Sequence, residues 1–172
     1  MEDLRQPRDD LGWLLRIAVD ADRPDALLAL LEAGFDPDAR APVEDGVDTW
    51  GMPLYTCVRG HKHEMAEMLL KFGADANGQV YASGTPLSEA YGQRDEEMIS
   101  LLVRHGGVPN ASMAGLYRRM DLALELLAKH GDAVLPDDGF SSGTVAEQLL
   151  GAAAKGGDPA ILRLAMSRVS IP

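Results

Sequence analysis

The 172-residue sequence has few of the residues that build a disulfide scaffold, an aromatic core or a membrane span. It contains a single cysteine, so an internal disulfide is impossible and the reducing cytoplasm is the expected compartment. Aromatic residues make up 5% of the chain and hydrophobic residues 46%, so leucine, alanine, methionine and valine must form the core. No apolar run approaches the roughly 18 residues that a membrane span needs, and residues 1–10 are too polar for a signal peptide.

Positive charge is also scarce, above all in the first third of the chain. The net charge is −11, and residues 1–50 contain 13 acidic and 5 basic residues, against 14 and 11 in residues 51–172. A nucleic-acid partner is disfavoured, because phosphate groups are bound by basic surfaces. The acidic first third could instead attract a protein with a basic surface. The alternative is that the acidity only keeps the protein in solution.

What the sequence does contain is a spacing that recurs along the chain. A leucine precedes a glycine by 19 positions three times: Leu15 and Gly34, Leu54 and Gly73, and Leu87 and Gly106. A fixed offset between a helix start and a glycine that ends a second helix is typical of stacked helical units. Such arrays commonly act as binding surfaces, so we expect this protein to bind a partner rather than to catalyse a reaction.

The residues that carry this spacing resemble the ankyrin repeat. The second unit contains Met52-Pro53-Leu54-Tyr55, Glu64, Leu69-Leu70 and Gly73-Ala74-Asp75-Ala76-Asn77, and the third contains Thr85-Pro86-Leu87, Leu101-Leu102 and Gly106. The register extends the resemblance over about residues 11–170. It implies an all-α ankyrin-repeat solenoid of about five helix-turn-helix units with short β-hairpin-like fingers.

The resemblance also implies one ankyrin repeat domain that spans residues 1–172. The units are expected at residues 11–40, 50–79, 83–110, 111–134 and 146–172, with longer loops at residues 41–49 and 132–145. The first connection is six residues longer than the second, because 39 positions separate Leu15 from Leu54 and 33 separate Leu54 from Leu87. Insertions in repeat arrays fall in loops on one face, often the binding face.

Two sets of residues in register are expected to pack the units together. Small residues share one position of the first helices and allow close approach: Ala18, Cys57, Ala90 and Ala153. Leucines share one position of the second helices and are expected in the core: Leu30, Leu69, Leu102 and Leu127.

The segment from His61 to Glu64 invites a chemical interpretation. A metal-dependent enzyme centred on His61, His63 and Glu64 is the alternative from a different functional class. The segment falls where ankyrin repeats turn between helices, and no cysteine, aspartate or third histidine at ligand spacing accompanies it. No P-loop, G-x-S-x-G or H-E-x-x-H motif is present. We therefore expect no enzyme activity, no metal and no cofactor, and we interpret Cys57 as a buried, unreactive thiol.

The resemblance implies partner contacts from the fingers and from the solvent-facing ends of the first helices. The finger residues are Arg40, Asp48, Trp50, Gln79 and Tyr81, and the first-helix residues are Arg59, Gln93, Tyr117 and Arg118. Tryptophan, tyrosine and arginine dominate interface energetics, although Trp50 and Tyr81 could instead brace their turns. We expect a monomeric protein–protein interaction module that binds another protein, with no membrane partner. The alternative is a dedicated inhibitor or immunity-type protein that masks a partner's active site.

Overall fold

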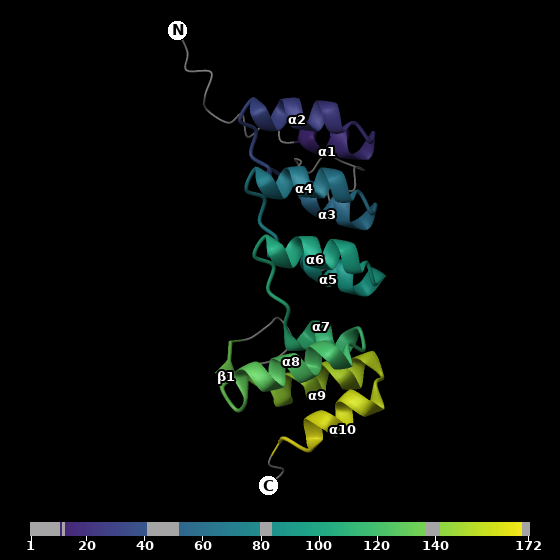
Figure 1. Ribbon diagram of the computed structural model, residues 1–172, viewed down its shortest axis with the longest axis vertical. Helices are drawn as coiled ribbons and strands as arrows, with labels where there is room; N and C mark the ends of the chain where they lie inside the picture. The colour runs from purple at the N-terminus through teal and green to yellow at the C-terminus, as the bar shows by residue number, and fades with distance from the viewer. Residues whose placement is uncertain (1–10, 12, 41–51, 80–83, 137–141, 170–172) are drawn as a thin grey trace. The chain divides into compact units, whose positions relative to one another are not determined.

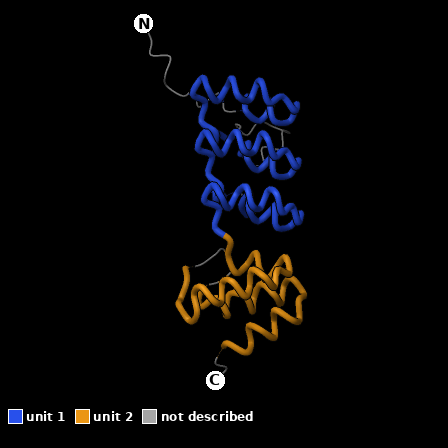
Figure 2. Tube along the Cα trace, in the orientation of Figure 1, with its two compact units in different colours: residues 1–108 blue, residues 109–172 orange. Residues whose placement is uncertain are grey.

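The computed structural model describes residues 11, 13–40, 52–79, 84–136 and 142–169 (Figure 1). Within these residues it contains ten helices and one two-stranded sheet, so the prediction of a mainly helical protein is confirmed. The chain divides into two compact units, residues 1–108 and residues 109–172 (Figure 2). None of the described helices is long and apolar enough to cross a membrane.

Unit 1 contains three helix-turn-helix pairs. They are α1 (Trp13–Asp20) with α2 (Pro24–Glu32), α3 (Pro53–Arg59) with α4 (His63–Lys71), and α5 (Pro86–Gln93) with α6 (Glu96–Arg104). The first helices α1, α3 and α5 pack side by side in chain order, and the second helices α2, α4 and α6 do the same (Figure 1). Equivalent residues of consecutive pairs therefore form rows across the unit.

The turn inside each pair holds one residue in the left-handed conformation, at the same register position. Asp22, His61 and Arg94 have φ angles of 54°, 53° and 58°. This conformation costs a residue other than glycine roughly 1–2 kcal/mol, so the packing of the flanking helices must impose it. The second helices end as predicted, because Gly34, Gly73 and Gly106 adopt positive φ angles just beyond them.

The core of unit 1 is built from the leucines and small residues predicted by register. Leu15, Leu54 and Leu87 are completely buried. Ala18, Cys57 and Ala90 are buried beside them, which lets neighbouring first helices approach closely. Small side chains at this position thus serve the stacking that the spacing predicts.

One predicted core leucine differs from its equivalents. Leu69 and Leu102 are completely buried, but Leu30 is only half-buried, and Leu27 and Leu31 fill the core of its helix instead. Leu30 lies on α2 of the first pair, which no described pair precedes, whereas α4 and α6 each follow another pair. The prediction of an interior position was therefore wrong for Leu30.

Unit 2 contains four helices and the small sheet. They are α7 (Ala111–Leu116), α8 (Met120–His130), β1 (Val134–Leu135), β2 (Gly143–Thr144), α9 (Val145–Gly156) and α10 (Pro159–Met166). Helix α7 packs closely on α9, because a side chain at Gly115 would collide with Ala152 and one at Gly156 would collide with the α7 backbone. Leu127 and Ala153 are buried, as their register predicts.

The loop predicted at residues 132–145 contains regular structure. β1 pairs antiparallel with β2, with Val134 opposite Thr144. Gln148 on α9 donates a hydrogen bond to the carbonyl oxygen of Pro136 at 2.9 Å, which ties the end of β1 to α9. Strands of two residues are too short to give the alternating pattern by which a strand is recognised in sequence.

Candidate interaction surface

The first helices of unit 1 carry a hydrogen-bonded group that links α3 to α5. The Tyr55 hydroxyl donates to Glu89 Oε2 at 3.1 Å, and Gln93 Nε2 donates to Glu89 Oε1 at 3.0 Å. Both oxygens of the Glu89 carboxylate therefore have a donor, which fixes its position at the surface of α5. Tyr55 itself is buried, so it belongs to the packed structure of unit 1.

Two of the predicted binding residues, Arg59 and Gln93, are brought together at the ends of these helices. Gln93 Nε2 also donates to the Arg59 carbonyl oxygen at 3.4 Å. Gln93 is half-buried, whereas the Arg59 side chain is exposed. Gln93 therefore holds the helix ends and the Glu89 carboxylate in place, and Arg59 is the one of the two that faces solvent.

The loops between consecutive pairs are joined by side chains. Asn77 Nδ2 donates to the Gly106 carbonyl oxygen at 2.9 Å, and the Val108 N–H donates to Asn77 Oδ1, also at 2.9 Å. Arg40 donates from Nη2 to the Gln79 carbonyl oxygen at 2.8 Å. Arg40 and Gln79, both predicted finger residues, thus lie together in the structure, and both are exposed.

Asp38 makes a similar connection one loop earlier. Both of its carboxylate oxygens lie 3.0 Å from the Asp75 backbone nitrogen, which donates to them. Burial raises the pKa of Asp38, the hydrogen bond from Asp75 lowers it, and the negative charges of Asp36 and Asp75 raise it again, so the net pKa is above its ordinary value. The hydrogen bond to Asp75 therefore forms although burial and two neighbouring carboxylates disfavour the charged form of Asp38.

The turns inside the pairs form a second polar edge. His61 Nδ1 lies 2.7 Å from Asp95 Oδ2, and His63 Nε2 lies 2.9 Å from the same oxygen. Lys62 forms an ion pair with Asp22 at 3.2 Å and donates to the Val19 carbonyl oxygen. The turn of the second pair is therefore bonded to both of its neighbours.

Asp95 is the centre of this edge. Its side chain is only 8% exposed, and its Oδ1 caps α6 by accepting from the Met98 N–H at 3.0 Å. Burial raises the pKa of Asp95, but hydrogen bonds from His61, the Met98 N–H and His63 more than offset this effect and lower the pKa to about 2. Asp95 is therefore ionised over the whole neutral range.

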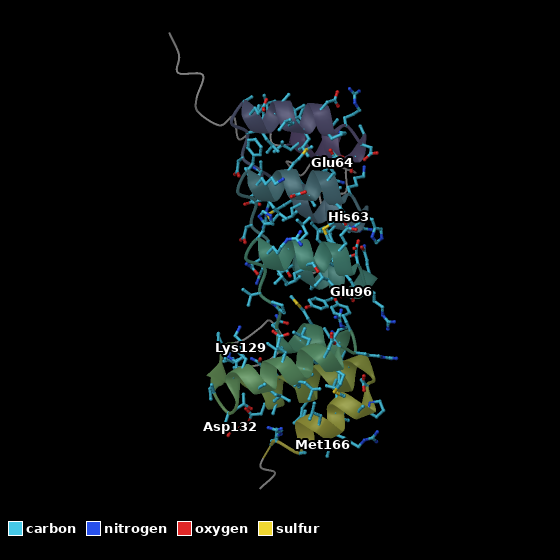
Figure 3. The ribbon with its side chains drawn as sticks, in the orientation of Figure 1. His63, Glu64, Glu96, Lys129, Asp132 and Met166 are labelled. Atoms are coloured by element: carbon cyan, nitrogen blue, oxygen red, sulfur yellow. The ribbon has the colours of Figure 1, made fainter. Side chains whose placement is uncertain are left out.

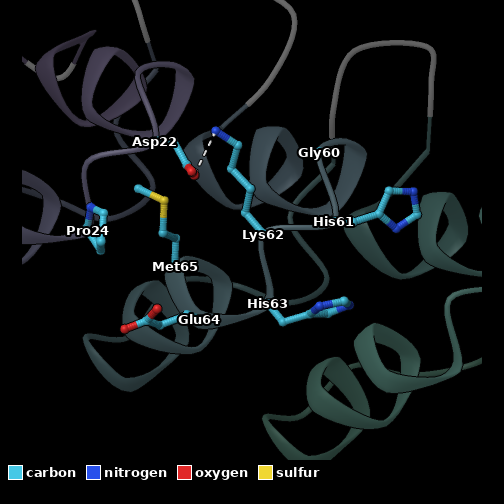
Figure 4. Close-up of a pocket in the computed structure, with 8 residues that line it drawn as sticks. All are labelled: Asp22, Pro24, Gly60, His61, Lys62, His63, Glu64 and Met65. Carbon is cyan, nitrogen blue, oxygen red and sulfur yellow. Dashed lines mark ion pairs between the residues drawn. The ribbon is translucent and has the colours of Figure 1, made fainter.

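The metal-dependent alternative requires Glu64 to join the two histidines. Figure 3 shows His63 and Glu64 at the beginning of α4, and in Figure 4 the Glu64 side chain points away from His61 and His63. The histidines instead bind Asp95, and no group of three acidic, histidine or cysteine side chains within the described residues could hold a metal ion. The geometry therefore gives this alternative no support.

A shallow pocket lies beside these turns. Its volume is about 440 Å³, and Figure 4 shows its lining residues: Asp22, Pro24, Gly60, His61, Lys62, His63, Glu64 and Met65. Lys62 and Asp22 are paired with each other across it. Two of its polar groups are thus satisfied within the chain.

Sequence reasoning missed the role of Asp95, because 34 positions separate it from His61. A signal was present in the register, since Asp95 follows Lys62 by the same 33 positions that separate Leu54 from Leu87. Stacking places equivalent turns side by side, so a carboxylate at residue 95 is expected next to the turn of residues 61–63.

Cys57 was interpreted as buried and unreactive. It is completely buried at a contact between helices, and burial raises the pKa of its thiol to about 12. Since the thiolate is the reactive form, this position does not favour nucleophilic chemistry.

The remaining predicted residues fall into two groups. In unit 2, Tyr117 is half-buried at the end of α7, and Arg118 is exposed and donates from Nε to the Gly156 carbonyl oxygen at 2.9 Å. Asp48, Trp50 and Tyr81 lie outside the described residues, so their predicted roles stay predictions.

No protein-family model matches the chain. Over 92 residues it is 34% identical to the B-cell lymphoma 3 protein homolog of Mus musculus, a match that covers 54% of this chain and 19% of that protein. Over 45 residues it is 47% identical to the serine/threonine-protein kinase VIK of Arabidopsis thaliana, which covers 26% of this chain and 10% of that protein. The chain thus spans a fifth or less of the length of these curated relatives. The partial matches are compatible with ankyrin repeats in this chain.

Proposed function

We propose that this protein is an ankyrin-repeat module that binds another protein through its inter-pair loops and the exposed ends of its first helices. The observation that carries the proposal is the register of unit 1, in which α1, α3 and α5 form one packed row. A row of equivalent, solvent-facing positions supplies a continuous surface on which individual residues can vary without loss of the scaffold.

The bonds between neighbouring loops support the proposal, because they order the surface before any partner arrives. Asn77 connects two loops through both ends of its amide, and Arg40 connects the preceding loop to Gln79. A surface that is already ordered loses less conformational entropy on association. Arg40 and Arg59 are the exposed arginines that we assign to binding, and arginine is enriched at interaction hot spots.

A protein that inhibits a specific enzyme is the second candidate. It is favoured by the concentration of acidic residues in the first third of the chain, which would speed association with a basic cleft. We assign no catalytic activity, because His61 and His63 are engaged with Asp95 and the Cys57 thiol is buried. A cytoplasmic location and a monomeric state are also part of the proposal.

Cross-linking mass spectrometry on the tagged protein in cells of the source organism tests the proposal. We expect a protein partner whose cross-links map to the inter-pair loops and first-helix ends of unit 1. Arg59→Ala should weaken capture of that partner, whereas Lys129→Ala, an exposed cation on α8, should not. Absence of any partner, or cross-links confined to α2, α4 and α6, would contradict the proposed surface. Loss of a specific enzyme's activity on binding would favour the inhibitor.

A further inference from the structure

Helix α1 has an apolar patch on the face opposite its core side. Leu15, Ala18 and Val19 are buried, whereas Trp13 is 36% exposed and Ile17 is 51% exposed. Residues four positions apart lie on the same side of an α-helix. Trp13 and Ile17 therefore form one patch that faces away from the core of unit 1.

The scaffold does not require the isoleucine of this patch. The position of Ile17 corresponds to Thr56 on α3 and Glu89 on α5, because 39 and 33 positions separate these residues. All three lie on helices that pack side by side, so they form a row from an apolar side chain through a hydroxyl to a carboxylate. Equivalent positions are polar in the other two pairs, so the stacking of the units does not explain an exposed isoleucine in the first.

Negative charge borders the apolar patch. Asp20, whose side chain is 54% exposed, follows Ile17 by three positions on the same face of α1 and forms an ion pair with Arg16 at 3.4 Å. Asp22, 76% exposed, lies in the next turn and is paired with Lys62 at 3.2 Å. Residues 13–40 contain six acidic and three basic residues. Arg59 is the exposed cation of the neighbouring helix α3, so the excess of acidic residues lies at the α1 end of the row.

The far end of the row carries a second fixed carboxylate. Glu89 is held by the Tyr55 hydroxyl and the Gln93 amide, so its position is defined before a partner binds. Adjacent packed helices are about 10 Å apart, so two helix spacings place Glu89 roughly 20 Å from Ile17. An extended chain covers this distance in about six residues.

We infer that the Trp13–Ile17 patch and Glu89 together receive a basic segment of another protein. The segment carries a large apolar side chain that packs on Trp13 and Ile17, with lysine or arginine beside it facing Asp20 and a second basic residue that reaches Glu89. This inference rests on the proposed binding function and adds the chemistry of the partner. Tryptophan beside an aliphatic residue, bordered by charge, is typical of an interaction hot spot.

The test is a selection of random 12-residue peptides displayed on phage against the immobilised full-length protein. We expect enriched peptides that combine a large apolar residue with lysine or arginine. Ile17→Thr, which introduces the residue found at the equivalent position of α3, should weaken the binding of these peptides more than tenfold. Leu124→Thr is the matched control, because Leu124 on α8 is also 51% exposed, and it should leave binding unchanged.

A second variant tests the far end of the row. Glu89→Gln removes the charge and keeps the size, and it should weaken binding of peptides with a distant lysine, with an effect that shrinks as salt rises. Circular dichroism checks that each variant is folded. Enriched peptides without basic residues, or equal effects of Ile17→Thr and Leu124→Thr, would overturn the inference.

Two further outcomes distinguish this inference from the proposed function. If no peptide is enriched but the cross-linking experiment finds a partner elsewhere on the loops, the inference fails and the proposed function stands. If sedimentation shows a dimer that Ile17→Thr converts to a monomer, the patch binds a second copy of the chain, and the assignment to a basic partner is wrong.

Discussion

Asp38 and Asn77 occupy the same position of consecutive units, and both connect their own loop to the next one. Asn77 does so with a donor and an acceptor, since its amide binds both the Gly106 carbonyl and the Val108 N–H. Asp38 can only accept, and it binds the Asp75 N–H with both carboxylate oxygens. The connection made by Asp38 therefore lacks the donated hydrogen bond that Asn77 makes in the next unit.

This difference predicts that Asp38→Asn stabilises the protein. The new amide keeps an acceptor for the Asp75 N–H and gains a donor, and it removes the repulsion from Asp36 and Asp75. We expect the free energy of unfolding to rise by about 0.5–1.5 kcal/mol, the net contribution of one hydrogen bond, as measured by urea denaturation at pH 7.

The same variant has a predicted pH dependence. A raised pKa in the folded state means that protonated Asp38 favours folding, and this contribution is lost as pH rises through the folded-state pKa. The advantage of Asp38→Asn should therefore be larger at pH 7 than at pH 3. An Asp38→Asn protein that is less stable than the wild type at pH 7 would contradict the account of this loop.

Asp95 predicts the opposite pH dependence. Its folded-state pKa is lowered to about 2, so it stabilises the fold above its ordinary pKa near 4, and the contribution is lost as pH falls towards 2. Asp95→Asn keeps a residue that can cap α6 but removes the charge. We expect it to lower the free energy of unfolding by about 2 kcal/mol at pH 7 and by much less at pH 2. A loss that is equal at both pH values would show that the histidine contacts contribute little.

The core prediction compares two leucines at one register position. Leu69→Ala should cost about 2–5 kcal/mol, because it opens a cavity in a completely buried site. Leu30→Ala serves as the control and should cost distinctly less, because Leu30 is only half-buried. Chemical denaturation of both variants measures the difference, and equal losses would mean that the pairs do not stack in the described register.

The strained turns give a fourth prediction. Arg94 is exposed and holds a φ angle of 58°, so Arg94→Gly should relieve strain and raise stability by roughly 0.5–1 kcal/mol. His61→Gly relieves similar strain but also loses the contact with Asp95, so its gain should be smaller or negative. Thermal unfolding compares the two, and a melting temperature that falls more for Arg94→Gly than for His61→Gly would contradict this explanation.

The sequence was most informative where a single local rule determines the structure. The glycines that end the second helices and the small residues of the first helices were identified from spacing, because left-handed caps and close helix contacts accept few residue types. The position of Leu30 could not be derived in this way, because its exposure depends on whether another pair precedes its own. β1 and β2 were missed because two residues carry no periodic signal.

The candidate site was predicted less completely than the fold. Arg40 and Gln79, and Arg59 and Gln93, were placed on the correct kinds of element, but their contacts depend on which backbone groups the stacking brings within reach. Asp95 escaped notice because its partners lie more than 30 positions away. The exposed patch of Trp13 and Ile17 could not be inferred either, since an apolar residue on α1 suits a buried position equally well.

Hydrogen–deuterium exchange of the protein with and without its captured partner tests the central claim most directly. If the first helices and loops of unit 1 form the binding surface, the partner should slow exchange at the exposed ends of α1, α3 and α5 and in the described loop residues 34–40 and 73–79. Exchange in α2, α4 and α6 should change little, apart from effects of overall stabilisation that reach all helices alike. Protection confined to the second helices or to unit 2 would contradict the proposed function of this surface.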